Sequence, residues 1–423
     1  MHMIRLTLLL SVLSLVKLSA QPVVQGQVEN TIAVDYISSV EFGHPSVDLT
    51  LPIVDLNSGG QLRLDFDDLE GGYKTYLYRI IHCDRNWYPT ETLDEIQYID
   101  GFNDEEVPGF SYSTNAYSDY THYDVSIPND DITWLLSGNY ALIIYEEDME
   151  VPVLIRKFIV AESMVSSMAE IIRPRKTSKS HSHQELSLVL NLEKAKVMRP
   201  LQEIEVTVMQ NGNWHTAQSG IKGTYIKQDN LHFDLYDLIS FPAIKEFRNF
   251  DIRNLGAQSL NVHSIERNDT ESKVLLQLGL RRTEKYYLNE LDANGQFVID
   301  NVDYPEPDVS SEYANVIFSV LSQHELDEDV YVFGAFSDWK PMESYRMTYD
   351  KERQLYHVTA PFKQGYYDYL FGTLNAEGDL DTSHFEGNWY ETENEYQIIV
   401  YFKEFGSEYD RVLGITKKES FFR

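Results

Sequence analysis

The chain has 423 residues, more than one ordinary domain holds, and 67 Asp and Glu against 35 Lys and Arg give a formal net charge of −32. A charge this negative repels nucleic acids and anionic lipid surfaces, so it excludes them as main partners and favours basic ones. Because Cys83 is the only cysteine, no intramolecular disulfide can form, and the domains must rest on their hydrophobic cores.

Residues 1–20 have the pattern of a secretory signal. Arg5 supplies the positive charge, residues 6–16 form an apolar run, and the small residues Ser19 and Ala20 precede a cleavage point. The run is too short to cross a bilayer, and no later segment is apolar enough to do so. No cysteine lies near the cleavage point, so a lipid anchor is not expected. The sequence therefore predicts a mature protein beyond the inner membrane that does not itself span a membrane.

Residues 21–162 are predicted to form an N-terminal β-sandwich. Alternating or continuous apolar residues bounded by turn residues predict strands at 62–67, 76–83, 125–127, 140–145 and 153–160. The long segment 87–123 has a loop-like composition that is both aromatic and acidic. Long loops in compact domains are often functional, so this segment is a candidate for partner contacts.

Residues 163–303 are predicted to form a middle β-sandwich. Ile204, Val206 and Val208 alternate with polar neighbours, and Asn211-Gly212 predicts a hairpin turn. The segment 241–248 predicts a short helical turn. A basic, polar stretch at 171–184 predicts a linker, and its His181 and His183 lack the acidic partner of a metal site.

Residues 304–423 are predicted to form a C-terminal β-sandwich after the proline-stiffened stretch 302–309. Strands are expected from Val330, at 355–359, at 366–371 and at 396–402. The predicted fold class is thus all-β, with three tandem immunoglobulin-like or early-set β-sandwich domains.

No nucleophile elbow, phosphate-binding glycine loop, zinc-ligand pair or dinucleotide motif occurs, so the sequence predicts no enzyme, cofactor or metal. One group of residues is a candidate hydrolase site. His82, Asp84 and Trp87 together with His122 in the segment 120–124 offer bases with orienting groups. A hydrogen-bonded knot that stabilises the long loop is the favoured interpretation, because no nucleophile accompanies them.

Residues 332–339 and 365–371 resemble the glycogen-binding type of carbohydrate module, an early-set sandwich. In that family exposed aromatic side chains stack on sugar rings, and Trp339 matches one such position. This resemblance implies an alternative function, a periplasmic or surface carbohydrate-binding protein.

The closing segment 385–414 contains a final strand framed by polar residues of the kind that tie loops to the backbone. We expect these residues to lock the last sandwich, and the exposed ones remain candidates for a partner contact: Glu386, Glu391, Thr392, Asn394, Asp410 and Arg411.

Short motifs spread along the chain together resemble the plug protein family of the type IX secretion system. They lie at 64–69, 78–87, 98–102, 120–123, 137–140, 246–248, 250–253, 364–367, 386–387, 391–394 and 410–411. The resemblance implies a non-catalytic periplasmic protein, monomeric and without a cofactor. It would bind the periplasmic opening of the outer-membrane translocon β-barrel and seal the idle pore.

Overall fold

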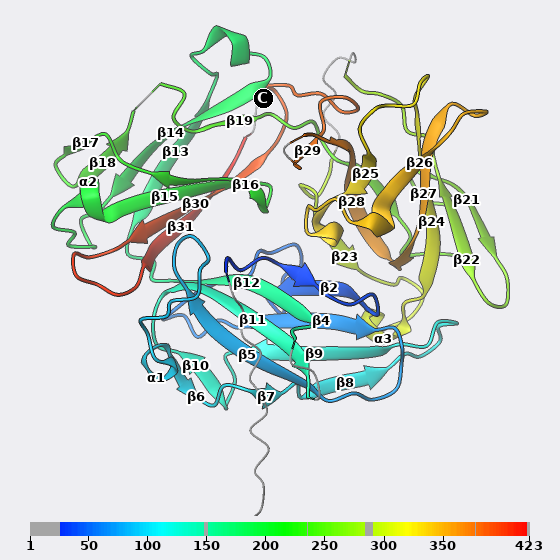
Figure 1. Ribbon diagram of the computed structural model, residues 1–423, viewed down its shortest axis with the longest axis horizontal. Helices are drawn as coiled ribbons and strands as arrows, with labels where there is room; N and C mark the ends of the chain where they lie inside the picture. The colour runs from blue at the N-terminus through cyan, green and yellow to red at the C-terminus, as the bar shows by residue number, and fades with distance from the viewer. Residues whose placement is uncertain (1–25, 148–150, 235, 284–290, 377, 421–423) are drawn as a thin grey trace, which may run out of the picture.

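The computed structural model describes residues 26–147, 151–234, 236–283, 291–376 and 378–420, so the predicted signal at 1–20 lies outside the described residues. Regular structure in these ranges is almost entirely β, which confirms the predicted all-β class. None of the helices in these ranges has the length and apolar content needed to cross a membrane. Three lobes surround a common centre (Figure 1), and we call them the N-terminal, middle and third domains.

The N-terminal domain is a sandwich of two main sheets with a small third sheet at its outer end. The first sheet has the order β1 (Thr31–Ile32), β12 (Leu154–Ala161), β11 (Gly138–Glu146), β5 (Tyr76–Cys83) and β7 (Glu105–Glu106), and β3 (Ile53–Asp55) pairs with β12. The second has the order β2 (Ile37–Gly43), β4 (Leu62–Asp68), β9 (Thr121–Ile127) and β8 (Gly109–Tyr112). The small sheet pairs β10 (Ile132–Trp134) with β6 (Ile99–Gly101), which follows α1 (Glu95–Tyr98).

The apolar pattern explains these strands. Leu62, Leu64 and Phe66 of β4 are buried in the sandwich core, and the intervening Arg63 and Asp65 face outward. By contrast, β11 is buried along nearly its whole length because its two faces meet different cores, with Leu142 in the sandwich core and Ala141 in the cluster that contains Ile399. The strands predicted in this domain are confirmed.

The middle domain also consists of two sheets. One has the order β13 (Ser166–Ile172), β14 (His183–Asn191), β18 (Asn230–Phe233) and β17 (Tyr225–Lys227), and β19 (Ser240–Pro242) pairs with β14. The other has the order β16 (Asn213–Ile221), β15 (Ile204–Gln210), β30 (Glu395–Phe402) and β31 (Arg411–Glu419). Its short helices are η1 (Thr177–Lys179) and α2 (Pro200–Glu203).

The third domain is one ten-stranded sheet that curls over a single core, because Phe250, Val274 and Phe318 from distant strands pack together. Its main path is β20 (Arg248–Asp251), β28 (Gly365–Leu374), β25 (Val330–Phe333), β26 (Arg346–Asp350), β27 (Leu355–Lys363), β24 (Tyr313–Leu321), β22 (Ser272–Leu276) and β21 (Val262–Arg267). Two further strands pair with β28, namely β23 (Phe297–Ile299) and β29 (Leu380–Asp381). Short helices complete it: α3 (Pro307–Ser310), η2 (Ala335–Ser337) and η3 (Glu343–Tyr345).

The predicted domain boundary between residues 303 and 304 is wrong, because strands from both sides of it pair in the same sheets. The last two strands, β30 and β31, leave the predicted C-terminal unit and pair in the middle domain, where Val400 lies opposite Val206. In exchange, the segment from β20 to β23 leaves the predicted middle unit and joins the third sheet. Red strands therefore lie within the green lobe in Figure 1.

The burial of β30 gives the physical reason for this exchange. Its Ile398 and Val400 pack into the core of the middle domain. Its Ile399 and Tyr401 face the opposite way and pack against the N-terminal domain, with Ile159 among their neighbours. A strand that is buried on both faces is apolar throughout, so its pattern does not reveal which sheet it joins.

Two local predictions also differ from the structure. The segment 241–248 is not a helical turn, because its ends belong to β19 and β20. The predicted linker at 171–184 connects β13 to β14, which pair directly, and so lies within one sheet. The loop-like segment 87–123 contains α1 and three short strands as well as the start of β9.

Candidate functional site at the junction of the three domains

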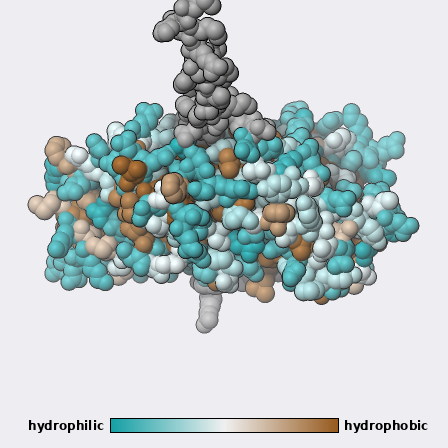
Figure 2. Space-filling model, turned by 90° about the horizontal axis from the view of Figure 1, so that it is seen from below, coloured by the Kyte–Doolittle hydropathy of each residue, from teal (hydrophilic) through white to brown (hydrophobic). Residues whose placement is uncertain are grey.

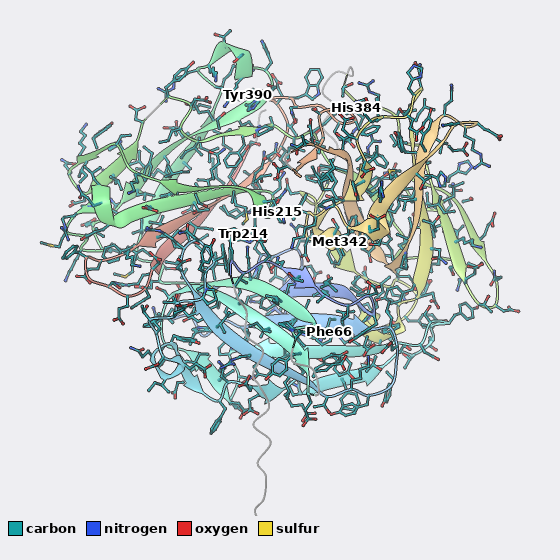
Figure 3. All side chains as sticks on the ribbon, viewed as in Figure 1. Phe66, Trp214, His215, Met342, His384 and Tyr390 are labelled. Carbon is teal, nitrogen blue, oxygen red and sulfur yellow. The ribbon has the colours of Figure 1, made fainter. Side chains whose placement is uncertain are left out.

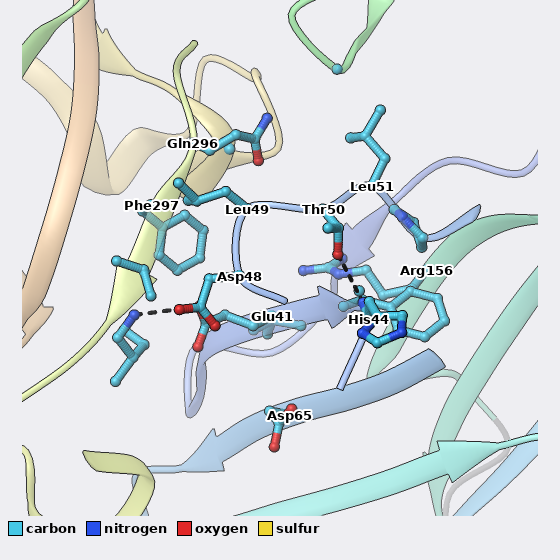
Figure 4. Close-up of a pocket in the computed structure, with 18 of the residues that line it drawn as sticks. Glu41, His44, Asp48, Leu49, Thr50, Leu51, Asp65, Arg156, Gln296 and Phe297 are labelled. Carbon is cyan, nitrogen blue, oxygen red and sulfur yellow. Dashed lines mark hydrogen bonds between the residues drawn. The ribbon is translucent and has the colours of Figure 1, made fainter. Parts of the chain in front are cut away.

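A cavity lies where the three domains meet. It has a volume of ≈ 510 Å³, and each domain contributes to its lining, as Arg156, Trp214 and Trp339 show. Trp214 and His215 of the middle domain lie at the centre of the molecule in Figure 3. In Figure 4 the loop between β2 and β3, with Asp48, Leu49 and Leu51, faces Gln296 and Phe297 of the third domain.

Some polar groups around this cavity bond across a domain boundary, and others, such as Lys157 and Glu29, pair within one domain. The Arg156 guanidinium lies 3.3 Å from the Asp338 carboxylate of the third domain. Burial raises the pKa of Glu41 to about 8, and this carboxyl accepts a 3.3 Å hydrogen bond from the Ile299 amide. The cavity is therefore a polar seam between domains, and its lining residues serve mainly to join them.

His82 is buried on β5 and is not exposed to a substrate. Its Nδ1 lies 2.9 Å from the Thr90 hydroxyl, and its ring packs edge-on against Tyr140. Burial lowers the pKa of His82 to about 4, so the ring is neutral at physiological pH. Gly138 is required beside it, because a Cβ there would approach His82 Nε2 to 2.3 Å.

Asp84 and Trp87 form the turn that follows β5. The Asp84 carboxylate accepts hydrogen bonds from the amides of Asn86 (2.8 Å) and Tyr88 (2.9 Å). The turn places Trp87, which is buried, edge-on against Trp214 of the middle domain at 4.9 Å. These two residues therefore join the N-terminal and middle domains.

His122 belongs to a buried network between the N-terminal and third domains. Its Nδ1 lies 2.9 Å from Asp67, whose carboxylate also accepts hydrogen bonds from the Lys363 ammonium (2.6 Å) and the Tyr313 hydroxyl (2.7 Å). Lys363 and Asp67 have side-chain exposures of 1% and 0%. The charges that hold these two domains together are thus shielded from water.

Asp65, His122 and Asp308 place one ligand atom each within 4.8 Å of one another, a spacing that a metal ion could use. Two observations favour an ion-pair network instead. The Arg63 guanidinium already lies 2.8 Å from Asp65 and 3.4 Å from Asp308. Burial lowers the pKa of His122, but its bonds to Asp65 and Asp67 outweigh this and raise it to about 9, whereas metal ligation requires a neutral ring.

The raised pKa of His122 predicts a pH-dependent stability. Its contribution is fully present below the unfolded pKa of 6.5 and is lost as pH rises through about 9. Denaturant unfolding should show that the stability advantage of the wild type over His122→Gln shrinks by about 3 kcal/mol between pH 6 and pH 10. A difference that does not change with pH would contradict this assignment.

The structure places Trp339 at the junction of the domains and not on an open binding face. Its ring packs edge-on against Phe247 at 5.7 Å, and a Cβ at Gly295 would approach the Trp339 ring to 2.1 Å. Trp339 also lines the central cavity. The exposed aromatic platform implied by the carbohydrate-module resemblance is therefore not present at this residue.

Glu386 joins separate segments of the third domain. Its carboxylate is fully buried and lies 2.9 Å from Arg248 Nε and 2.6 Å from Arg282 Nε. It also accepts a 3.1 Å hydrogen bond from the Phe371 amide. Burial raises the pKa of Glu386, but the two arginines outweigh this and hold it below its ordinary value.

The motif residues at 391–394 bind the middle domain and not the predicted last sandwich. The Gln184 amide donates to the Thr392 carbonyl at 2.7 Å, and the Asn211 amide donates to Asn394 Oδ1 at 2.8 Å. Thr392 and Asn394 are buried. Glu391 differs, because it forms a half-exposed ion pair with Arg173 at 3.1 Å.

Asp410 and Arg411 connect the end of the chain to the N-terminal domain. Arg85 Nη1 lies 3.6 Å from Asp410, and Arg411 Nε donates to Glu162 at 2.7 Å. Burial raises the pKa of Asp410, and the bond to Glu162 raises the pKa of Arg411. The predicted motif residues therefore act at several separate contacts and do not form one site.

Sequence reasoning missed the partners in these contacts. The sequence around these partners is that of ordinary strands or turns, and only their ion pairs in the folded protein identify them: Asp67, Lys363, Arg85 and Glu162. Only Asp68 carried a signal at the end of β4, because it breaks the apolar alternation that Asp67 continues.

Residues 37–162 match the family model described as the type 9 secretion system plug protein 1st domain. The resemblance to the plug protein family is confirmed over this domain. The plug-family domain spans β2 to β12 and thus nearly all of the N-terminal sandwich. The match indicates association with the type 9 secretion machinery in a role that the family suggests is non-catalytic.

A solved structure of a hypothetical protein from Parabacteroides merdae ATCC 43184 shares the fold beyond the plug-family domain. It has a TM-score of 0.89 and 26% sequence identity, and the alignment covers 94% of this chain and 100% of that chain. The alignment with the C-terminal domain of the Streptococcus pyogenes antigen I/II-family protein AspA covers 91% of this chain and 100% of that chain, with 8% sequence identity. Its TM-score of 0.17 does not indicate a shared fold. No curated protein matches the chain.

Proposed function

We propose that the protein is a periplasmic plug. It binds the periplasmic opening of the outer-membrane type 9 secretion barrel and seals the pore while no substrate passes. The observation that carries this proposal is the family match over residues 37–162. The secretory signal predicted from the sequence supports a location beyond the inner membrane.

A plug must resist deformation, and the contacts between domains supply that resistance. Asp67 and Lys363 fix the N-terminal domain to the third domain, and Arg411 and Glu162 fix it to the end of the chain. Ile399 and Tyr401 add an apolar contact between the N-terminal and middle domains. Three sandwiches held in this way form a wide, stiff body, which suits occlusion better than a string of mobile domains.

The competing functions receive less support from the geometry. A hydrolase that uses His82 and His122 needs an open surface beside them, and both rings are buried and hydrogen-bonded within the N-terminal domain. A carbohydrate-binding protein needs an accessible aromatic platform, and Trp339 packs at the domain junction.

Purification of the secretion barrel from native outer membranes in mild detergent tests the proposal. We expect the chain to co-purify with the barrel in its idle state and to be depleted from barrels trapped with a substrate. The chain's absence from idle barrels across repeated preparations would reject the plug function. An unrelated periplasmic protein of similar charge serves as the control for non-specific retention.

A further inference from the structure

One face of the N-terminal domain presents large apolar side chains to solvent, and we call it the α1–β6–β10 face. Ile96 of α1 is 82% exposed, Phe102 after β6 is 73% exposed, and Leu135 after β10 is 46% exposed. Short backbone bonds hold the elements together, since the Leu135 amide donates to the Tyr98 carbonyl at 2.8 Å. The face lies at the outer edge of the domain, away from the other two domains (Figure 1).

The small sheet that carries this face packs against the core on one side. Ile99, Ile132 and Trp134 point inward and belong to the sandwich core. Phe102 and Leu135 directly follow the two strands and are exposed, and they lie at opposite ends of the paired segment. Seen from below, brown apolar groups stand among teal polar ones over this part of the molecule (Figure 2). Exposed apolar groups that are rimmed by polar residues are typical of protein interaction sites.

The rim of this face is acidic. Asp94, Asp100, Asp130 and Asp131 are exposed around it. Residues 86–147 contain 13 Asp and Glu and no Lys or Arg. The nearest arginine, Arg79, reaches over from β5 and is paired with Glu95 and Asp104. The face therefore has a negative potential that its own segment does not offset.

We infer that the α1–β6–β10 face docks a basic segment of the secretion barrel, with Lys or Arg side chains around an apolar residue. This inference rests on the proposed plug function and assigns its contact surface. Charge complementarity selects the occupant, because positive groups would meet the acidic rim while the apolar residue covers Phe102 and its neighbours. A second copy of the chain would oppose two acidic faces, and an anionic membrane would be repelled.

A matched pair of variants tests the assignment during purification of the barrel from native membranes. The triple variant Ile96→Ser, Phe102→Ser and Leu135→Ser removes the apolar groups from the face. The control variant Met198→Ser, Leu260→Ser and Leu291→Ser removes apolar groups that are at least as exposed from the other domains. We expect the first to co-purify at least tenfold less than wild type and the control to be unchanged. Raising the salt concentration should also release wild type from the barrel.

The outcomes separate the two claims. Retention of both variants at the wild-type level would overturn the assignment of this face and leave the plug function standing. Failure of wild type itself to co-purify would overturn both. A wild-type dimer in sedimentation that the first variant abolishes would assign the face to self-association and also overturn the inference. Circular dichroism and thermal unfolding verify that each variant is folded.

Discussion

Replacing Lys363 with Met is expected to destabilise the protein by about 3 kcal/mol, because it removes one of the two cations that face the buried Asp67 carboxylate. The two groups lie 2.6 Å apart with almost no exposure to water. The Tyr313 hydroxyl and the His122 ring remain as partners of Asp67, and the protonated ring replaces the lost ammonium only in part because Asp65 shares it. Denaturant unfolding followed by tryptophan fluorescence measures the change.

The double variant Asp67→Asn with Lys363→Met is the control for this prediction. It removes both charges, so it should recover most of the lost stability. Because the Lys363 ammonium also donates to the Asp308 carbonyl at 2.6 Å, Lys363→Met alone should speed proteolytic cleavage near residues 302–306, where the chain is exposed between β23 and α3 of the third domain. A loss below about 1 kcal/mol would show that the pair does not hold these domains together.

Glu386→Gln is expected to cost about 3 kcal/mol of stability or more. The substitution keeps the shape of the side chain but removes the negative charge that two buried arginines, Arg248 and Arg282, both face. The loss should fall on the third domain, where hydrogen exchange of β20 and β28 would increase. Differential scanning calorimetry combined with hydrogen exchange measures both effects.

Glu391→Gln is the matched control, since Glu391 belongs to the same closing segment and also faces an arginine. Its pair with Arg173 is half-exposed, with side-chain exposures of 44% and 45%, so the change should stay below about 1 kcal/mol. Equal effects of the two substitutions would mean that burial does not set the energy of these pairs.

Local strand structure was largely predictable, and the assembly of strands into sheets was not. The alternation in β4 and the continuous apolar run in β11 determined strand type and burial directly. The strand that pairs with β30 could not be derived in this way. Ile398 and Ile399 face two different cores, but in the sequence both are apolar and nothing distinguishes them. Pairing across so great a sequence distance depends on packing that no local pattern records.

The candidate residues were predicted better as a group than in their individual roles. The polar residues of the closing segment do fasten loops, as Thr392 and Asn394 show. The sequence did not predict that the last two strands pair in the middle domain. For that reason it did not predict that Thr392 and Asn394 bind the middle domain or that Arg411 binds the N-terminal domain. The resemblance to a binding module implied that Trp339 is exposed, yet its ring packs against Phe247 of the same domain and lines the central cavity.

The return of β30 and β31 to the middle sheet determines the order in which the chain can fold. A chain that is made from its N-terminus presents β15 long before β30, since β15 ends at Gln210 and β30 begins at Glu395. The sheet of the middle domain therefore keeps an unpaired edge until the last residues are available, whereas all strands of the third domain precede Glu395. A nonsense mutation just before Glu395 would therefore leave the third sheet intact and expose the unfinished middle domain to proteases.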